Sequence, residues 1–302
     1  MTKGDVIKEF ANERPTSRGV YGYGSNVFKQ ASVDTQESQT DVIFIVDDLR
    51  EWHQVNMEWN PKDYSFLGRM HLNRKAIDKI KGKNNITYFS HIQGEVGYFK
   101  YGVIEINDFI CSLSTWNNLF VVGRFQKPTL EVYSERRIRE SIQYNRECAL
   151  LVASLFANRI TTKWELYSKL CGLSYAGDAR MLLAENPNKV ANIVAGSYKL
   201  LKKLYPLNQD YLIELGEEKV LVRYDVLLKH IADLPVSLLM YLDDLGTDFS
   251  DLEMVRKNIG TYFYEHNKTE SRAQIMEGFK TNGVVRSVPY VVSKVKKRFC
   301  SR

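Results

Sequence analysis

The sequence GYGSNVFKQ at residues 22–30 is followed, after a polar stretch, by DVIFIVDD at residues 41–48. Gly24 lets the backbone approach a phosphate group closely, because it has no side chain. The Ser25 hydroxyl and the N–H groups of a following helix can bind phosphate oxygens. Asp41 opens a run of β-branched and aromatic residues typical of a strand, and its carboxylate can bind Mg²⁺. These residues predict a turn and a strand that together bind phosphate groups and a metal ion.

A Gly-Ser turn before a strand that begins with aspartate is typical of nucleotidyltransferases, although an ordinary strand and turn without a ligand fits the same residues. The general pattern has a second carboxylate two residues further on, where this chain has Ile43. Asp47 shares a strand face with Asp41 but would lie about 20 Å away. Asp178, in a Gly-Asp turn, is the alternative metal ligand, and a helix N-cap explains it equally well.

Candidate phosphate-binding cations are Lys100, Arg124 and Lys127. Arginine binds phosphate through two parallel hydrogen bonds, whereas lysine acts as a point charge. His53 and Asn56 are three residues apart and share one face of an expected helix, where they can contact a base or ribose. An exposed loop position for Lys127 and a plain helix-surface role for His53 and Asn56 are the simpler alternatives.

Length and composition indicate a globular protein with one large or two ordinary domains. The chain has 302 residues, of which 44% are hydrophobic and 26% charged. Its longest apolar run, residues 148–157, is shorter than the roughly 20 residues that cross a bilayer. The four cysteines are far apart and the five histidines form no pair at metal-binding spacing, which disfavours disulfides and zinc.

The basic charge is concentrated at the C-terminal end. The net charge is +6, and residues 272–302 carry eight Lys or Arg and one acidic residue. The other 271 residues carry 34 basic and 35 acidic side chains, which leaves them at −1. A nearly neutral body disfavours a nucleic-acid partner.

The tail also has an amphipathic pattern. Six apolar residues form one helical stripe, and Ser287 can cap a helix that has Pro289 in its first turn. Such a helix suits the surface of an anionic membrane, and packing of the apolar stripe on the body is the alternative. The stripe is Val284, Val288, Val291, Val292, Val295 and Phe299, and the membrane-facing cations are Arg286, Lys294, Lys296, Lys297 and Arg298.

Local patterns predict an α+β body up to about Pro128 and mostly helices after it. Strands are expected at 20–23, 41–46, 86–89, 98–106 and 120–124, and helices over 1–18 in part, from 26, over 48–57 and over 107–118 with an Asn or Asp cap. A polar loop is expected at 32–40. Further helices are expected over 136–157, from a Thr161-Thr162 cap to 170, and up to 205, with a strand pair at 211–215 and 220–224.

Several long motifs, in this order, resemble the mitochondrial-type CDP-diacylglycerol synthases, a phosphatidate cytidylyltransferase family also found in some bacteria. They are GYGSNVFKQ (22–30), DVIFIVDD (41–48), Trp52-His53 with Asn56, YSFL (64–67), KYGVI (100–104), WNNLFVVGRFQKP (116–128), GLSYAGDARM (172–181) and GFKTNGVVRSVPYVVSKVKK (278–297). Asp63 precedes Tyr64-Ser65 where the family has a histidine-containing stretch, so a role that needs histidine there does not carry over.

The resemblance implies a nucleotidyltransferase domain at 1–130, a helical, winged-helix-like domain at 131–270 and a membrane-associating tail at 271–302. It implies an enzyme that uses Mg²⁺, CTP and phosphatidate to make CDP-diacylglycerol and pyrophosphate. Within that expectation Ser25, Asp41 and Lys127 are catalytic. Gly24, Ser25, His53, Asn56, Lys100, Arg124 and Lys127 bind the nucleotide, and Asp41 and Asp178 bind the metal.

The first residues show neither a secretory signal nor an Arg-rich import leader, which favours a bacterial or a processed form. The expected place is the inner face of a bacterial cell membrane, or the matrix side of the mitochondrial inner membrane. Two alternatives remain: a nucleotidyltransferase with another acceptor, and a non-enzymatic winged-helix regulator, which the missing second carboxylate would favour.

Overall fold

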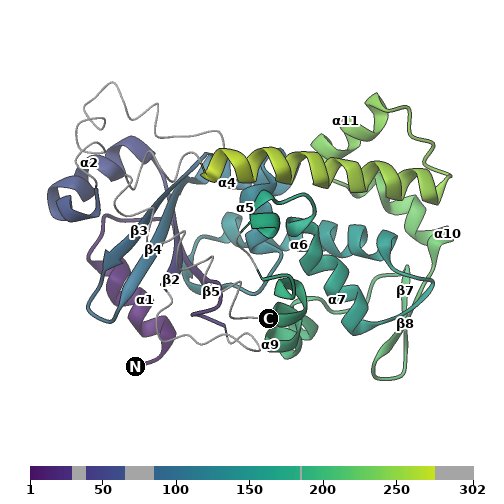
Figure 1. Ribbon diagram of the computed structural model, residues 1–302, viewed down its shortest axis with the longest axis horizontal. Helices are drawn as coiled ribbons and strands as arrows, with labels where there is room; N and C mark the ends of the chain where they lie inside the picture. Colours follow the sequence, from purple (N-terminus) through teal and green to yellow (C-terminus); the bar gives the residue numbers. More distant parts are fainter. Residues whose placement is uncertain (29–38, 65–84, 184–185, 276–302) are drawn as a thin grey trace.

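A mixed five-stranded sheet is the frame on which the N-terminal half is built (Figure 1). The computed structural model describes residues 1–28, 39–64, 85–183 and 186–275. The strands are β1 (Gly19–Tyr23), β2 (Thr40–Val46), β3 (Ile86–Gln93), β4 (Tyr98–Glu105) and β5 (Leu130–Ser134). Their order is β3-β4-β2-β1-β5; β2 and β4 are parallel, and the other neighbours are antiparallel. The predicted α+β class is confirmed.

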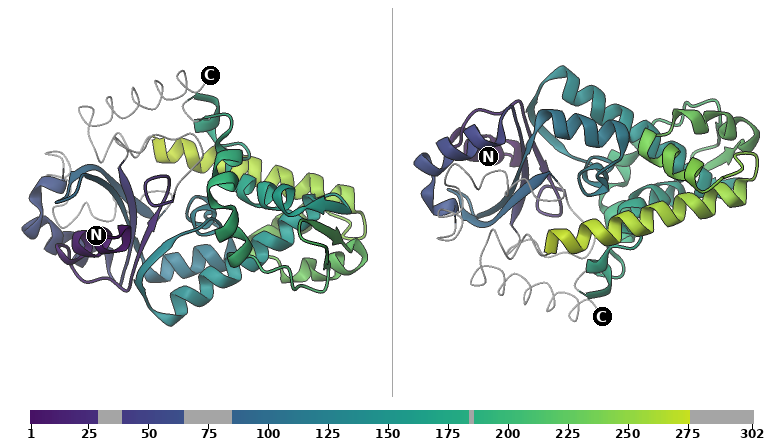
Figure 2. Two further views of the ribbon diagram at one scale, coloured as in Figure 1. Left: turned by 90° about the horizontal axis from the view of Figure 1, so that it is seen from below. Right: turned by 90° about the horizontal axis from the view of Figure 1, so that it is seen from above.

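Alternation along β2 divides the interior into two cores, because successive side chains of a strand point to opposite faces. Val42, Phe44 and Val46 join the core beneath two helices, and Ile43 and Ile45 join the larger core on the other face. The first face is covered by α1 (Lys3–Asn12) and α2 (Leu49–Trp59), and the second by α4 (Ile106–Thr115), α5 (Leu119–Phe125) and α6 (Arg136–Phe156) (Figures 1 and 2).

The rest of the described chain is mostly helical and carries a small antiparallel sheet of order β6-β8-β7, formed by β6 (Ile160–Thr162), β7 (Leu212–Leu215) and β8 (Lys219–Val222). Thr162 caps the following helix reciprocally with Glu165, so the predicted cap is confirmed. The predicted strand pair is also confirmed. The helices are α7 (Lys163–Gly172), α8 (Ala179–Leu183), α9 (Lys189–Leu204), α10 (Tyr224–Leu227), α11 (Val236–Asp244) and residues 252–275; short 3₁₀ turns are η1 (Pro61–Asp63), η3 (Leu173–Tyr175) and η4 (Leu228–Asp233).

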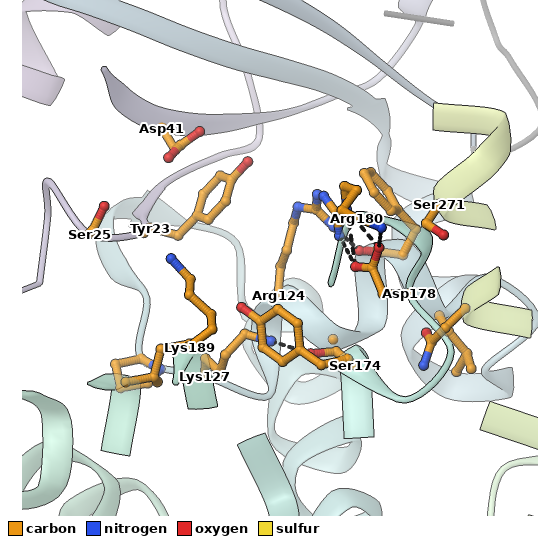
Figure 3. Close-up of a pocket in the computed structure, with 18 of the residues that line it drawn as sticks. Tyr23, Ser25, Asp41, Arg124, Lys127, Ser174, Asp178, Arg180, Lys189 and Ser271 are labelled. Atoms are coloured by element: carbon orange, nitrogen blue, oxygen red, sulfur yellow. Dashed lines mark hydrogen bonds and ion pairs between the residues drawn. The ribbon is translucent and has the colours of Figure 1, made fainter. Parts of the chain in front are cut away.

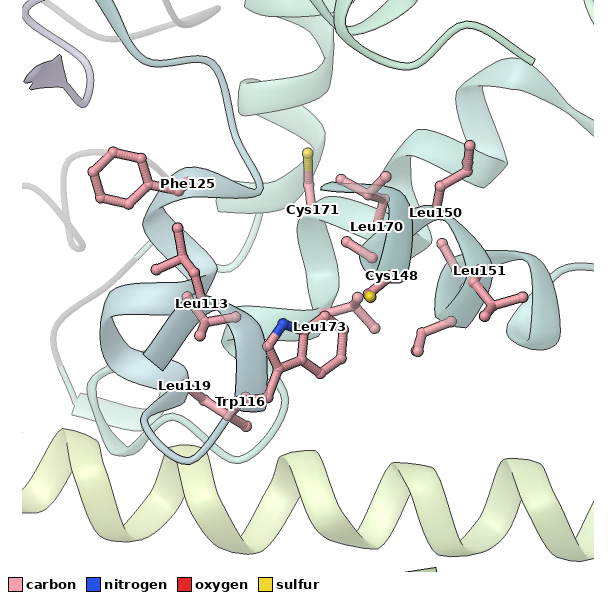
Figure 4. Packing of buried hydrophobic residues seen from close by; sticks show 14 of the residues in the cluster. Leu113, Trp116, Leu119, Phe125, Cys148, Leu150, Leu151, Leu170, Cys171 and Leu173 are labelled. Carbon is pink, nitrogen blue, oxygen red and sulfur yellow. The ribbon is translucent and has the colours of Figure 1, made fainter. Parts of the chain in front are cut away.

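The larger core is continuous from the sheet into this helical part. Trp116, at the end of α4, is fully buried and lies in the same cluster as Cys148 of α6 and Leu170 of α7 (Figure 4). Its indole nitrogen donates to Asn145 Oδ1 at 2.9 Å. Its carbonyl oxygen accepts a hydrogen bond from the Tyr262 hydroxyl at 2.8 Å, so the helix 252–275 is attached to the same corner. In the described part of the chain, no helix has both the length and the apolar character needed to cross a membrane.

Two assignments around Pro128 are wrong. The segment 120–124, predicted as a strand, belongs to the helix α5. It is almost wholly buried and pairs with no strand, so a helix satisfies its backbone N–H and C=O groups within the segment. Residues 130–134 were expected in the helical part, but they form β5, which pairs with β1 and extends the sheet past the predicted domain end at 130.

Other differences are local. The predicted helix from 26 appears, as far as residue 28, as a turn in which the Phe28 N–H donates to the Gly24 carbonyl at 3.0 Å. The helix predicted over 107–118 is confirmed, but its N-cap is Glu105, without a capping side-chain hydrogen bond. The predicted loop at 32–40, up to residue 38, and the tail cations Arg286, Lys294, Lys296, Lys297 and Arg298 lie outside the described residues.

A buried polar network fixes α2 against the sheet. The Arg14 guanidinium lies 3.0 Å from Asp63 Oδ2, and both side chains are almost fully buried. The Tyr101 hydroxyl donates to the same carboxylate at 2.9 Å, and Asn56 Nδ2 donates to the Tyr101 hydroxyl at 3.1 Å. The Tyr64 hydroxyl accepts a second hydrogen bond from Asn56. Asp63 is therefore the anion of a network that is shielded from water.

We predict that Asp63→Asn lowers the free energy of unfolding by about 3 kcal/mol, because it removes the buried counter-ion of Arg14 and leaves only the half-exposed Glu13 carboxylate, 3.4 Å away. The matched control is Asp47→Asn, since Asp47 pairs with Arg18 at 2.7 Å but both side chains are about half exposed. An exposed pair contributes about 1 kcal/mol or less. Urea unfolding of the three proteins measures both values, and equal losses in the two variants would contradict the prediction.

Candidate functional site

Three pocket residues form one row across the sheet. Tyr23 of β1 pairs with Asp41 of β2, and Asp41 pairs with Lys100 of β4. Side chains at paired positions project from the same face, so all three line one pocket. Lys100 Nζ lies 3.7 Å from Asp41 Oδ1, and the two side chains are 20% and 25% exposed. The Asp41 carboxylate therefore remains accessible from the pocket.

The turn after β1 is fitted closely to this carboxylate. Gly24 has a φ of +82°, a conformation that favours glycine, and a Cβ atom there would lie 2.7 Å from Asp41 Oδ2. Asn26 Nδ2 donates to Thr40 Oγ1 at 2.8 Å, which holds the turn beside the start of β2. Ser25, between these two residues, lines the same pocket. Glycine at position 24 thus leaves open the space in front of the carboxylate.

Arg124 and Lys127 enter the pocket from α5 and the residues after it (Figure 3). The Arg124 guanidinium lies over the Phe120 ring, 3.6 Å from its centroid. Lys127 Nζ donates to Ser174 Oγ at 2.6 Å. Burial, together with the nearby Arg124 and Arg180 charges, lowers the pKa of Lys127 to about 7. A phosphate group would restore the charged form, because an anion nearby raises the pKa of an ammonium group.

Two more cations line this wall, Arg180 of α8 and Lys189 of α9. Arg180 Nε donates to both carboxylate oxygens of Asp178, at 2.9 and 3.0 Å. Asp178 is buried and also accepts the main-chain N–H of Arg180 at 2.9 Å, as an N-cap residue does. Asp178 therefore fixes Arg180 in place, and a metal role for this carboxylate would require Arg180 to leave it.

A third segment, the end of helix 252–275, completes the pocket. Asn267, Glu270 and Ser271 line it. Glu270 Oε1 accepts the main-chain N–H of Leu119 at 2.9 Å. Burial raises the pKa of Glu270 to about 7, although the main-chain N–H groups of Leu119 and Phe120 act in the opposite direction.

The structure brings most of the predicted site residues together. Around this one pocket lie Gly24, Ser25, Asp41, Lys100, Arg124, Lys127 and Asp178.

His53 and Asn56 lie elsewhere, fully buried in the core on the opposite face of the sheet. His53 Nδ1 is 2.9 Å from the Tyr64 hydroxyl, and burial lowers the pKa of His53 to about 3. Both residues belong to the buried network of α2, not to the pocket wall.

Sequence reasoning did not identify Ser174, Arg180, Lys189 or Glu270. Ser174 and Arg180 lie in the GLSYAGDARM stretch at 172–181, so the motif contained a signal for them. Lys189 and Glu270 lie on helices with ordinary local patterns, and only the tertiary structure brings them to the pocket.

The pocket can hold Mg²⁺ only with help from a ligand. In the residues that the structure describes, no group of three or more His, Cys, Asp or Glu side chains could hold a metal. Mg²⁺ is commonly bound by one or two carboxylates, several waters and the phosphates of a substrate. The accessible Asp41 carboxylate, open on the Gly24 side, fits this mode of binding.

The Gly-Ser turn and the Asp41 carboxylate thus face Arg124, Lys127, Arg180 and Lys189 across a single pocket (Figure 3). Guanidinium and ammonium groups in this arrangement suit the phosphate groups of a polyanionic ligand. Residues 5–225 match the family model described as phosphatidate cytidylyltransferase, mitochondrial. The chain belongs to this enzyme family.

Individual relatives support the same family assignment. The mitochondrial phosphatidate cytidylyltransferase of Schizosaccharomyces pombe is 32% identical over 315 residues, which cover 93% of this chain and 80% of the relative. The proteins of the same name from Dictyostelium discoideum and Homo sapiens are 32% and 36% identical, over 69% and 61% of this chain. The matches span 54% and 41% of those two longer relatives.

We predict that binding of inorganic tripolyphosphate weakens as the pH rises from 6 to 8. Lys127, with its pKa near 7, is charged below that pH and loses its charge above it. Above pH 7 the affinity for tripolyphosphate should fall by up to about tenfold per pH unit because of Lys127 alone. Lys127 should also take up a proton when the ligand binds. Titration calorimetry in buffers of different ionisation enthalpy measures both effects.

The control is Lys127→Arg, because arginine is charged at both pH values. Comparison of the two proteins also removes the effect of tripolyphosphate ionisation, because the ligand ionises in the same way with both proteins. Identical proton uptake in the wild type and the variant would show that Lys127 does not titrate on binding.

Proposed function

We propose that this chain is a CTP:phosphatidate cytidylyltransferase, which makes CDP-diacylglycerol and pyrophosphate. The observation that carries the proposal is the match of residues 5–225 to the phosphatidate cytidylyltransferase family. The pocket supports it, since Ser25 and Asp41 face Arg124 and Lys127 across a space lined by charged groups (Figure 3). Both substrates are phosphate anions, and such a pocket suits them.

The proposed reaction is a displacement at phosphorus. A phosphate oxygen of phosphatidate attacks the α-phosphorus of CTP and forms a new P–O bond. The bond from the α-phosphorus to the oxygen shared with the β-phosphate breaks, and that oxygen leaves with pyrophosphate. The nucleophile is already an anion, so the main demand on the protein is to bring two anions together and stabilise the charge of the transition state.

The chain's own residues supply that stabilisation in two groups. Ser25 and the turn beside it are placed to donate hydrogen bonds to the triphosphate. Arg124 and Lys127, together with Arg180 and Lys189, form the opposite wall and would bind the remaining phosphate oxygens. Lys100, beside Asp41, adds one more positive charge.

We assign Mg²⁺ to Asp41. When bound, the ion neutralises charge on phosphate oxygens and aligns the reacting groups. Asp41 lies at the start of β2, and it would bind Mg²⁺ jointly with substrate phosphates. Asp178 remains the alternative ligand, provided that Arg180 moves from its carboxylate.

The finer fold assignment is also a proposal. The sheet with Gly24, Ser25 and Asp41 at one end of neighbouring strands suits a nucleotidyltransferase-like domain. The order α6-β6-α7-η3-α8-α9-β7-β8, with the strands arranged β6-β8-β7, suits a winged-helix-like domain. The continuous core between the two parts indicates that they fold as one body.

We further propose that residues 284–302 bind an anionic membrane surface, where phosphatidate is found. The support is the valine stripe and the basic residues of this segment. The relatives are named as mitochondrial enzymes, which favours the mitochondrial inner membrane over a bacterial membrane.

Two other functions are tested by one experiment. Labelled CTP is supplied together with a lipid extract or with nucleic acid, and the labelled product is isolated. Label in the lipid alone supports the proposal, and label in nucleic acid supports another acceptor. If neither acceptor is labelled by the folded protein, the non-enzymatic alternative is favoured.

We predict that Asp41→Asn lowers cytidylyl transfer by about a hundredfold or more, because a lost metal ligand removes several kcal/mol of transition-state stabilisation. The amide is nearly isosteric, so the melting temperature should change little. Asp47→Asn, a substitution just beyond the other end of the same strand, is the control and should keep full activity. Near-normal turnover of Asp41→Asn would exclude Asp41 as an essential ligand.

We predict that deletion of residues 284–302 abolishes salt-sensitive binding to vesicles that contain phosphatidate. Each basic residue near such a surface contributes about 1 kcal/mol, and salt screens it. Activity on vesicles should fall more than activity on detergent-dispersed substrate. Sedimentation with vesicles at two salt concentrations measures binding, and unchanged sedimentation of the shortened protein would contradict the membrane role.

A further inference from the structure

Helix 252–275 reaches the pocket with one of its faces. Asn267, Glu270 and Ser271 are spaced i, i+3 and i+4, so their side chains lie on the same side of the helix. All three line the pocket, although this helix lies beyond residues 5–225, which match the family model. Figures 1 and 2 show the helix running along the helical part and ending beside the sheet.

Glu270 caps a helix that is remote in sequence. The N-cap residue of α5, Asn118, makes no capping side-chain hydrogen bond, and the Leu119 N–H donates instead to Glu270 Oε1 at 2.9 Å. The first N–H groups of a helix have no partner inside it, and a carboxylate at this end is favourable. Glu270 therefore fixes the first turn of α5 from a residue 151 positions away.

The position of α5 decides where two of the pocket cations lie. Arg124 is on this seven-residue helix, and its guanidinium donates to the Phe120 carbonyl and lies over the Phe120 ring. Phe120 directly follows Leu119, the residue that Glu270 binds. Lys127 comes three residues after Arg124. A shift of the first turn would thus move the Arg124 guanidinium and the chain that leads to Lys127.

The same helix face also fixes the other cationic segment. Asn267 Nδ2 donates to the carbonyls of Leu173 and Ala176, at 2.8 and 2.9 Å. The Ala179 N–H donates to Ser271 Oγ at 3.0 Å. Gly177 lies in the same loop, between Ala176 and Ala179, and packs directly against this helix: a Cβ atom there would lie 2.3 Å from the backbone oxygen of Tyr264. The loop held in this way carries Ser174, the partner of Lys127, and Arg180.

We propose that Glu270 is a positioning residue, whose hydrogen bond to the start of α5 sets Arg124 and Lys127 in the geometry that binds the anionic substrate. This rests on the proposed role of these two cations as phosphate ligands. Glu270 acts through α5, and its effect depends on the length of its side chain. The residues 267–271 thereby form a third wall, shared by the two segments that carry the cations.

Two conservative variants separate position from charge. Glu270→Gln keeps the length and an acceptor oxygen, whereas Glu270→Asp keeps the charge but is one methylene shorter. The affinity for inorganic tripolyphosphate, measured by calorimetry without metal, should stay within about threefold in Glu270→Gln and fall about tenfold in Glu270→Asp. In transfer assays, Glu270→Asp should raise the KM for CTP. Glu270→Gln should have a KM for CTP close to that of the wild type.

The control is Glu265→Asp, on the same helix, where the carboxylate accepts a hydrogen bond from the Tyr241 hydroxyl at 3.0 Å outside the pocket. It should bind tripolyphosphate as the wild type does, and thermal melts of all variants check folding. Wild-type affinity in Glu270→Asp, or an equal loss in Glu270→Gln, would overturn the proposal. Wild-type protein that binds tripolyphosphate but transfers no cytidylyl group would instead contradict the proposed function.

Discussion

Burial of several cations around one pocket is the constraint on which the structure around the site depends. Arg124, Lys127, Arg180 and Lys189 line a common wall, and the pKa of Lys127 is lowered mainly by burial and further by the neighbouring positive charges. Such a group of side chains persists only if the backbone beneath it is rigid. The closely packed α5, the bidentate Asp178 pair and the helix face at 267–271 provide that rigidity. An anionic ligand would offset the positive charge of these side chains.

Sequence patterns predicted the elements whose stability is local. The strand β2 followed from its β-branched run, and the start of α7 followed from the threonine cap. The pattern failed for α5, because LFVVGRF has the composition of a strand and becomes a helix only through its surroundings. It also failed for β5, whose pairing with β1 joins residues more than a hundred positions apart. In both cases tertiary contacts outweighed local propensity.

The candidate site was accessible to sequence reasoning where its residues lie in dense motifs. Gly24 and Asp41 come from adjacent motifs, and the strand register explains why they meet. His53 lies in an equally distinctive motif, but its helix α2 covers the other face of the sheet. Side-chain alternation along β2 shows which face each strand residue points to, but it does not show which face the following helix covers. Glu270 carries no local signal, because its function depends on a contact with Leu119 that only the folded chain creates.

That contact also has a consequence for the order in which the site is made. Leu119 and Glu270 are 151 residues apart, and ribosomes add about 5–20 residues per second, so roughly 8–30 s separate their synthesis. During this interval the strands of the sheet have been synthesised, but the wall that we propose orients Arg124 does not yet exist. A nascent chain that ends before Glu270 therefore lacks the contact that, in our proposal, orients the phosphate-binding cations.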